Sequence, residues 1–252
     1  MATFDPVAAL ALPEKALVDR RVPKSLLIEN GASTAADRRR IREGIEELRW
    51  AAALKPTTIG VSEYRDETRE YLEIAVLNLI LRSGADAGRL AELVHRAVPY
   101  PVLLVATNGN TPEISLAHKR WSQGEAGKTV IDGEIVASDD LVGCSDESTA
   151  AFRSSLALDR QGRATLHDLY QGWIDKVEAL NVARVTGEFS IPTSSTAAAE
   201  RSAALRDYWQ LETRIAELHA AAEKERQIAR KVEINLKLAR LRDNRDSARA
   251  RL

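Results

Sequence analysis

Residues 101–116 read PVLLVATNGNTPEISL, and this run predicts a β-hairpin. The uninterrupted apolar stretch 101–106 is typical of a strand that is buried on both faces. Asn108 and Gly109 tolerate the positive φ angles of a tight turn, and an extended pattern resumes at residues 114–116. Two antiparallel strands in the middle of the chain place a β-sheet at the centre of the expected fold.

The segments on both sides of the hairpin add strands and helices to this sheet. Residues 129–137 alternate apolar and polar side chains, which predicts a further strand. Residues 58–81 are expected to form two strands around a charged turn at 65–68, with a helix as the alternative for the second strand. Four apolar residues indicate a short helix before the hairpin: Leu90, Leu93, Val94 and Ala97. The expected fold class is α+β, with a mixed five-stranded sheet and flanking helices.

A first helix is expected in front of the sheet. Ser33 or Thr34 can cap its N-terminus, and Pro56 would stop it. Between these points apolar residues recur at helical spacing, at Ile41, Ile45, Leu48 and Ala52. This helix completes the α+β domain, which we place at residues 1–142.

Helical segments follow this domain. Residues 143–190 are expected to form a helical connector that ends at Gly187. Residues 191–252 comprise a hinge rich in Ser, Thr and Ala, followed by a long terminal helix. From Arg201 onward there is no proline or glycine, so the composition offers no obvious break in that helix.

The terminal helix carries a coiled-coil pattern. Its apolar or small residues recur at steps of three and four, with polar defects at Glu225 and Asn235. This seam consists of Tyr208, Leu211, Ile215, Leu218, Ala222, Ala229, Val232, Leu236 and Ala239. A helix cannot cover its own seam, so we expect it to pair with a protein partner or with a second copy.

The large residues of this seam are the predicted interface, together with Trp209. The set is Tyr208, Trp209, Leu211, Ile215, Leu218, Val232 and Leu236. Because Tyr208 and Trp209 are adjacent, both cannot face one narrow seam. One of the two aromatic side chains is therefore expected to meet another surface.

The composition excludes several classes of protein. The chain has 252 residues and a formal net charge of −1, which gives no chain-wide attraction to nucleic acid or membrane. A single cysteine, Cys144, excludes an internal disulfide. No apolar run is long enough to span a bilayer and no signal peptide opens the sequence, so we expect a cytoplasmic protein that does not contact membranes.

Several separated segments resemble a bacterial family of unknown function. They are VDRRVPKSLL from Val18, ELRWAAALKPTTIGV from Glu47, HRAVPYPVLLVATNGN from His95, ISLAHKR from Ile114, LHDLYQGWIDKVEAL from Leu166, VTGEFS from Val185 and EKERQIARKVEINLKLARLR from Glu223. In their order and spacing they are similar to domain-of-unknown-function family 4391 over nearly the whole chain. No established activity of this family transfers to a residue.

The resemblance also implies a context. Genes of this family tend to lie beside DNA methyltransferases and superfamily-two helicases in restriction-like phage-defence loci. This implies a subunit or accessory protein of a DNA-processing system, with a helicase or a DNA methyltransferase as partner. The link is one of association, because a family does not by itself define a mechanism.

One set of residues suggests catalysis. Nucleases of the restriction type hold Mg²⁺ with carboxylates on neighbouring strands, beside a lysine. Glu70, Glu73, Glu113 and Lys119 could supply these groups. The pattern is weak, because Glu113 and Lys119 are six positions apart. Alternation along the same strand places Ile114, Leu116 and His118 opposite Ser115, Ala117 and Lys119.

Other signatures of catalysis or metal binding are missing from the sequence. The four histidines and Cys144 form no closely spaced ligand pairs, so no zinc site is expected. The run GEAGKT at residues 124–129 has too few residues between its glycines for a phosphate-binding P-loop. We therefore expect no cofactor and no resident metal.

Local groups of basic residues favour contact with nucleic acid. The candidates are Arg20, Arg21, Lys24, Lys119 and Arg120. Their binding to phosphate would weaken steeply with salt. With the coiled-coil pattern and the family resemblance, these features favour a non-catalytic subunit of a DNA modification or restriction-type complex. A divergent metal-dependent nuclease is the alternative, and an inhibitor or toxin-neutralising protein is a third interpretation.

Overall fold

The computed structural model describes residues 4–109, 111–125, 127–138 and 144–252. The chain divides into two units, Met1–Asn181 and Val182–Leu252. The strands are β1 (Leu17–Arg21), β2 (Ile45–Leu54), β3 (Tyr64–Arg65), β4 (Glu70–Tyr71), β5 (Ile74–Leu81), β6 (Val102–Asn108), β7 (Thr111–Trp121) and β8 (Thr129–Ala137). The α-helices are α1 (Pro6–Ala9), α2 (Lys24–Gly31), α3 (Ala35–Gly44), α4 (Pro56–Ile59), α5 (Ala87–Ala97), α6 (Asp146–Ser155), α7 (Leu166–Thr186), α8 (Ser195–Lys224) and α9 (Ile228–Arg249).

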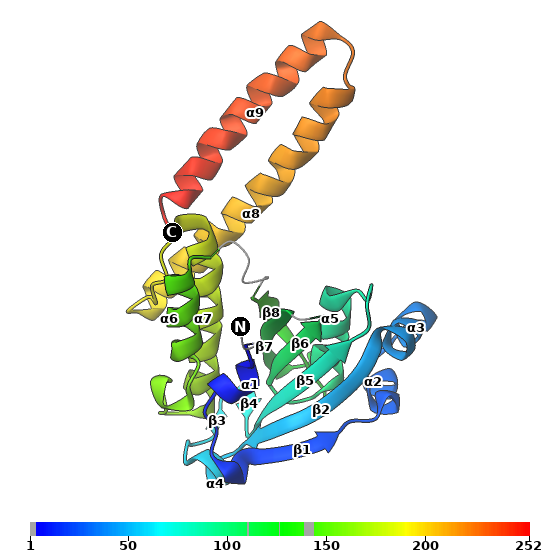
Figure 1. Cartoon of the computed structure of the whole chain (residues 1–252), viewed down its shortest axis with the longest axis vertical. Coiled ribbons are helices and arrows are strands. Elements are labelled where there is room, and N and C mark those ends of the chain that lie inside the picture. Colours follow the sequence, from blue (N-terminus) through cyan, green and yellow to red (C-terminus); the bar gives the residue numbers. More distant parts are fainter. Residues whose placement is uncertain (1–3, 110, 126, 139–143) are drawn as a thin grey trace. The chain divides into compact units, whose positions relative to one another are not determined.

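The first unit is built on one mixed sheet, which confirms the predicted fold class. Its strand order is β1-β2-β5-β6-β7-β8, with β3 and β4 forming a separate two-stranded sheet. Strands β5 and β6 are parallel, and every other neighbouring pair is antiparallel. Helix α5 connects the two parallel strands (Figure 1), as parallel pairing requires a crossover. The sheet has six strands where the sequence predicts five.

One unpredicted strand, β2, comes from a segment that reads as helix. Thr34 caps α3 as predicted, because its Oγ1 accepts a hydrogen bond from the Asp37 N–H at 3.1 Å. The helix ends at Gly44, however, and the next ten residues form β2. Pairing of β2 with β5 shifts register between Ile45 and Glu47. This irregularity puts Ile45 and Leu48 on one face although they are three residues apart, which imitates helical spacing.

The segment 58–81 is only partly as predicted. Its first strand is wrong, because Pro56–Ile59 forms the short helix α4. The charged turn at 65–68 is confirmed, and Asp66 Oδ1 accepts hydrogen bonds there from the Thr68 and Arg69 N–H groups. The second strand is also confirmed, as β4 followed by β5 rather than a helix.

The central hairpin and the last strand are confirmed. Asn108 in β6 pairs with Thr111 in β7, and Gly109 in the turn has a φ angle of 66°. Strand β8 then pairs with β7 over the predicted residues. The alternation along β7 is also confirmed, since its two sets of side chains contact different helices, as described below.

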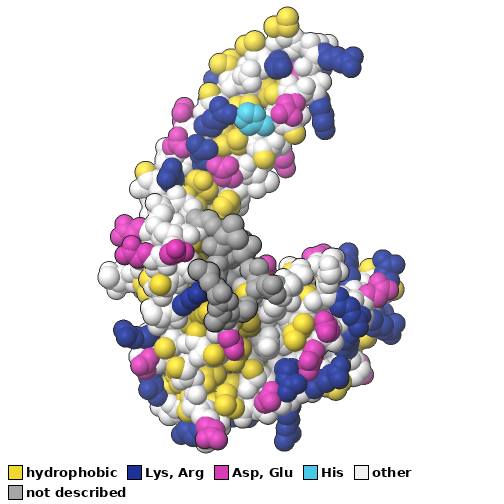
Figure 2. All heavy atoms as spheres, in the orientation of Figure 1, with side chains coloured by type: hydrophobic (Ala, Val, Ile, Leu, Met, Phe, Trp, Pro, Cys, Tyr) yellow, Lys and Arg dark blue, Asp and Glu magenta, His cyan; other side chains and the backbone are white. Residues whose placement is uncertain are grey.

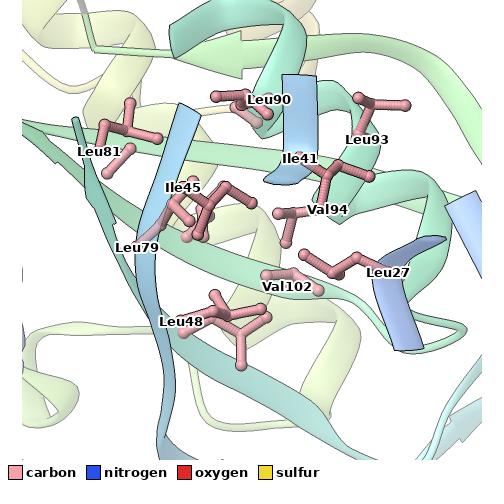
Figure 3. Packing of buried hydrophobic residues seen from close by; sticks show 14 of the residues in the cluster. Leu27, Ile41, Ile45, Leu48, Leu79, Leu81, Leu90, Leu93, Val94 and Val102 are labelled. Carbon is pink, nitrogen blue, oxygen red and sulfur yellow. The ribbon is translucent and has the colours of Figure 1, made fainter. Parts of the chain in front are cut away.

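An apolar core fills the space between one face of the sheet and helices α2, α3 and α5 (Figure 3). Its largest members are Leu27, Ile41, Ile45, Leu48, Leu77, Leu79, Leu81, Leu90, Leu93, Val94, Val102 and Leu104. Gly31 allows α2 to approach α5, because a Cβ atom built at this position would lie 2.7 Å from the Leu93 carbonyl oxygen. The close approach explains why this face leaves little room for substitutions.

Helix α7 lies against the other face of the same sheet. Tyr170 is fully buried, and its hydroxyl accepts from the Ala117 N–H at 2.8 Å and donates to the Val102 carbonyl at 2.7 Å. Trp173 is also fully buried and donates to the Leu156 carbonyl at 2.9 Å. The two aromatic residues therefore tie α7 to the sheet and to the segment after α6.

The second unit contains two antiparallel helices, α8 and α9, where the sequence pattern reads as one (Figure 1). The chain turns at Glu225–Gln227, at the polar defect of the seam. Ion pairs link the two helices, at 3.0 Å between Glu212 and Arg245 and at 2.9 Å between Asp207 and Arg251. We call this unit the helical hairpin.

Candidate interaction site

Helix α9 has two apolar faces, and the first packs on α8. Leu238 and Ala248 are buried, and Ile234 and Leu241 lie on the same helical face and are half-buried. On α8 the matching buried residues include Ile215. This inner face closes the helical hairpin.

The second apolar face of α9 is exposed. Ile228, Val232 and Leu236 are 83%, 53% and 60% exposed. They are spaced by four residues and so share one face. Leu236 precedes Leu238 by two residues, which is about 200° of helical rotation, so the exposed row points away from α8. Figure 2 shows apolar side chains at the surface of the helical hairpin. We call residues 228–239 of this face the outer seam.

The predicted interface residues thus fall into two groups. On α8, Ile215 is buried and Tyr208, Leu211 and Leu218 are half-buried, so the first half of the predicted seam faces α9. On α9, Val232 and Leu236 belong to the outer seam. Trp209 is 41% exposed and its ring meets the edge of Tyr208 at 5.3 Å between centroids. The two aromatic residues diverge, as expected for neighbours on one helix.

Two charged residues, Glu233 and Arg240, lie beside the outer seam on one side. Arg240 is exposed and forms no ion pair within the described chain, whereas Lys231 precedes Leu238 by two helical turns and so lies on the side of the inner face. The only acidic residue beside the seam, Glu233, is paired with Lys237 at 2.7 Å. Arg242 reaches across to His219 on α8 through a hydrogen bond of 2.5 Å. Arg240 is therefore the one basic residue at the edge of the seam without an ion pair among the described residues.

The structure separates the five predicted nucleic-acid contacts. Arg20 and Arg21 lie exposed on the edge strand β1. Lys24 instead donates to the carbonyls of Arg42, at 3.3 Å, and Ile45, at the C-terminal end of α3. Burial, with Arg82 and Arg21 nearby, lowers the pKa of its ammonium group.

The other two candidates are also occupied within the fold. Lys119 is 1% exposed and donates to the carbonyls of His95 and, at 3.0 Å, Val98. It satisfies the C-terminal end of α5, and burial lowers the pKa of its ammonium to about 8. Arg120 pairs with Asp132 at 3.4 Å. Only Arg20 and Arg21 of the set are exposed without an ion pair among the described residues.

The carboxylates of the nuclease alternative do not gather around Lys119. Glu70 pairs with Arg65 at 3.5 Å, and Glu73 is 6% exposed and pairs with Lys55 at 2.8 Å. Glu113 is six residues from Lys119 along β7, a separation of roughly 20 Å in an extended strand. Within the described residues there is no group of three or more His, Cys, Asp or Glu side chains that could hold a metal ion.

A histidine network that sequence analysis missed joins β4, β7 and α7. Gln171 Nε2 donates to Asp175 at 2.7 Å, so Gln171 Oε1 must accept at 2.8 Å from the Nε2–H group of His118. His118 Nδ1 then accepts from the Tyr71 hydroxyl. Burial lowers the pKa of His118, which favours this neutral tautomer. Both of its ring nitrogens are used, so the network holds elements together rather than exposing an acid or base.

His167 packs on this network. Its ring stacks on His118 at 5.2 Å between centroids and lies 4.8 Å from the Tyr64 ring. Burial lowers its pKa as well. The members come from sites 47 and 53 positions apart in the sequence, so no local motif could have revealed them.

Comparison with known proteins gives a family but no close relative. No curated protein and no solved structure matches the chain. Among the described residues, no helix is long and apolar enough to cross a membrane. The family model for a domain of unknown function, DUF4391, matches residues 10–244. The chain belongs to the DUF4391 family.

Proposed function

We propose that this protein is a non-catalytic subunit of a bacterial DNA modification or restriction-type phage-defence complex, joined to its partner through the helical hairpin. The observation that supports assembly is the outer seam of α9, where Ile228, Val232 and Leu236 are all more than half exposed. Aliphatic side chains in a continuous row on one face mark a surface that another protein covers.

The energy available on this seam is sufficient for specific assembly. Complete burial of one Val, Leu or Ile side chain contributes about 1.5–3 kcal/mol. The three exposed residues of the row therefore offer several kcal/mol if a partner covers them. A charged side chain at the edge, such as Arg240, adds selectivity and speed of association more than affinity.

The nature of the complex rests on the family resemblance. The gene neighbourhood that it implies points to a helicase or a DNA methyltransferase as partner, and the protein's own described residues offer no metal cluster. The nuclease alternative lacks geometric support, because Glu113 lies far along β7 from Lys119. Of these two functions, the exposed row on α9 favours a subunit that assembles over one that cleaves.

Co-purification tests this proposal. The tagged protein is expressed with whichever DNA methyltransferase or helicase its neighbouring genes encode, as the family resemblance implies. We expect at least one of them to co-elute with the wild type and to be lost from a Val232→Gln, Leu236→Gln double variant. The matched control is Leu17→Gln with Leu26→Gln, at residues 52% and 47% exposed in the first unit. Co-elution that survives in the outer-seam variant would contradict assembly through α9.

Direct contact with DNA is a second candidate function. Arg20 and Arg21 are exposed on an edge strand and form no ion pair among the described residues. Each phosphate contact contributes about −0.9 to the slope of log K against log salt. Replacing both arginines by alanine should therefore flatten the slope by about 2 in a binding titration with duplex DNA. An unchanged slope would remove these residues from any DNA surface.

A further inference from the structure

We infer that two copies of this chain join through strand β8 of the first unit, which pairs with its own copy in antiparallel fashion about a two-fold axis at Val130. This inference goes beyond the proposed function, because it concerns a surface of the first unit and not the helical hairpin. The observations that carry it are the unpaired backbone edge of β8, the groove beside that edge and the register that the strand allows.

The two edges of the six-stranded sheet differ. The sheet ends in β1 on one side and in β8 on the other. Strand β1 has five residues, and Asp19 within it has a φ angle of 46° where the register with β2 shifts. Irregularity and exposed charge keep an edge from pairing with another strand. In β8, residues 129–132 follow a regular register with β7 and include the β-branched residues Val130 and Ile131, so this part of the edge accepts a further strand.

The backbone groups of Thr129 and Ile131 point to this open edge. The Ser122 N–H donates to the Lys128 carbonyl at 2.8 Å, so this pair is hydrogen-bonded between the two strands of the β7–β8 hairpin. Hydrogen-bonded and non-hydrogen-bonded pairs alternate along an antiparallel ladder. Thr129 and Ile131 lie one and three residues after Lys128 in the same register, so their N–H and C=O groups turn away from β7. No other described strand pairs with them.

A second β8 strand satisfies these groups in one register. With the two-fold axis at Val130, Thr129 of one copy lies opposite Ile131 of the other, and each such pair exchanges N–H···O bonds in both directions. Gly133, with a φ angle of 80°, follows the regular segment and ends it. An axis further along the strand would therefore lose one of the hydrogen-bonded pairs.

A groove beside β8 receives the side chains of the added strand. This groove, of about 690 Å³, lies between β8 residues that include Ile131 and the α5 residues Gly88, Glu92 and Arg96. Ile131 of the second copy lies opposite Thr129, which also lines the groove, so its side chain points into it. Glu92 and Arg96 pair with each other at 2.6 Å. The groove therefore accepts an aliphatic side chain without leaving a charge unpaired on this wall.

The residues on the opposite face fit a second copy as well. Val130 is 36% exposed and meets Val130 of the other copy at the axis, where each covers the other. Lys128 lies opposite Asp132, whose carboxylate pairs with Arg69 at 3.1 Å and Arg120 at 3.4 Å within its own chain. Like charges are therefore not directly opposed in this register. An unrelated strand would need a matching side chain at each position, whereas a second copy supplies them.

Sedimentation velocity on the full-length protein tests the inference. We expect a monomer–dimer equilibrium in which the dimer prevails at about 100 µM. Ile131→Pro removes an N–H group that β7 does not use, and should weaken dimerisation by at least about tenfold. The matched control Ile131→Val keeps the N–H group and the branched side chain, and should dimerise like the wild type. A wild-type protein that stays monomeric at this concentration would overturn the inference.

A complementary pair of variants tests the symmetry at Val130 without proline. Val130→Arg places two Arg side chains opposite each other across the axis, and Val130→Glu places two Glu side chains there. Each variant alone should dimerise at least about tenfold more weakly than the wild type. An equimolar mixture places Arg opposite Glu, so it should form a dimer that contains one copy of each. A mixture that dimerises no more tightly than the separate variants contradicts the two-fold axis at Val130 and overturns the inference.

Other results separate this interface from the proposed function. A dimer that is lost in the Val232→Gln, Leu236→Gln variant and kept in Ile131→Pro lies at the outer seam, and overturns the inference. If the wild type is monomeric but still co-purifies with its partner, the proposed function holds and the β8 interface is wrong. If Ile131→Pro disperses the wild-type dimer but no partner co-purifies, the inference holds and the proposed complex is wrong.

Discussion

Helices α7 and α9 differ in how far their apolar side chains are buried. Along α7, Tyr170 and Trp173 are fully buried, and both donate hydrogen bonds to buried carbonyls. Along α9, Leu238 is 3% exposed while Leu236, two positions earlier, is 60% exposed. The chain itself covers the apolar side chains of α7, whereas α9 keeps an apolar face that the described chain does not cover.

This difference indicates that the apolar and charged side chains of the two units have different roles. In the first unit even the buried cation Lys119 is used internally, since it donates to the end of α5. Such a unit gains its stability from its own contacts. The helical hairpin instead exposes Ile228, Val232 and Leu236. We therefore propose that its outer seam serves recognition rather than folding.

The largest effect on stability is expected at Trp173. Trp173→Ala removes a fully buried ring and its hydrogen bond to the Leu156 carbonyl, and should lower the free energy of unfolding by about 3–5 kcal/mol. Denaturant unfolding followed by circular dichroism measures the change. A loss under 1 kcal/mol would show that α7 is not the closed element described above, since about 3 kcal/mol is the lower end for such a cavity.

A matched pair on α9 sharpens the comparison within one helix. Leu238→Ala should cost about 2–3 kcal/mol, because this side chain is 3% exposed between the two helices. Leu236→Ala, at a side chain 60% exposed, should change stability by less than about 0.5 kcal/mol. The same denaturant unfolding experiment compares the two variants. Equal costs would mean that the outer seam is covered in the isolated protein.

The sequence predicts those parts of the fold in which local pattern and tertiary structure agree. The hairpin of β6 and β7 is of this kind, because an apolar run and an Asn108-Gly109 turn both favour it. Strand β2 is the opposite case. Because of the register shift after Ile45, Ile45 and Leu48 lie on the same buried face although they are three residues apart. This spacing is typical of a helix, although the segment is a strand.

The candidate site was predictable only in part, for a related reason. The pattern at Val232 and Leu236 is readable because a coiled-coil seam is local in sequence. The same pattern does not show that α9 has a second apolar face at Leu238, nor that the chain reverses at Glu225. Contacts such as Tyr71 with His118 depend on tertiary structure alone.

The close approach of α2 to α5 predicts a smaller effect. Gly31→Ala places a Cβ atom 2.7 Å from the Leu93 carbonyl oxygen and 2.9 Å from the Ala97 Cβ, so the helices must separate. We expect a loss of about 1–3 kcal/mol. The control Gly88→Ala on α5 meets no atom within 4 Å and should be neutral or stabilising by up to about 1 kcal/mol. Thermal unfolding of both variants tests this, and similar melting temperatures would contradict tight packing here.

The smallest effect concerns the pH dependence of stability. His95 belongs to α5 and its side chain is fully buried, where its Nε2 lies 3.0 Å from Ser115 Oγ and its Nδ1 has no hydrogen-bond partner among the described residues. Burial, with Lys119 nearby, lowers its pKa to about 3 from 6.5. Below pH 6.5 the unfolded chain therefore binds a proton at His95 and the folded protein does not, so the free energy of unfolding falls.

Proton binding at His95 in the unfolded chain makes the free energy of unfolding depend on pH. The His95→Gln variant should lose this part of the dependence. The contribution of one such group approaches about 1.4 kcal/mol per pH unit. Between pH 6.5 and 5.5 the wild type should lose about 1 kcal/mol more than His95→Gln does. Only the difference in slope is compared, so any constant destabilisation of the variant cancels. Parallel curves would mean that the folded protein admits the proton at His95, and that the core beneath α5 is more open to water than the closed first unit allows.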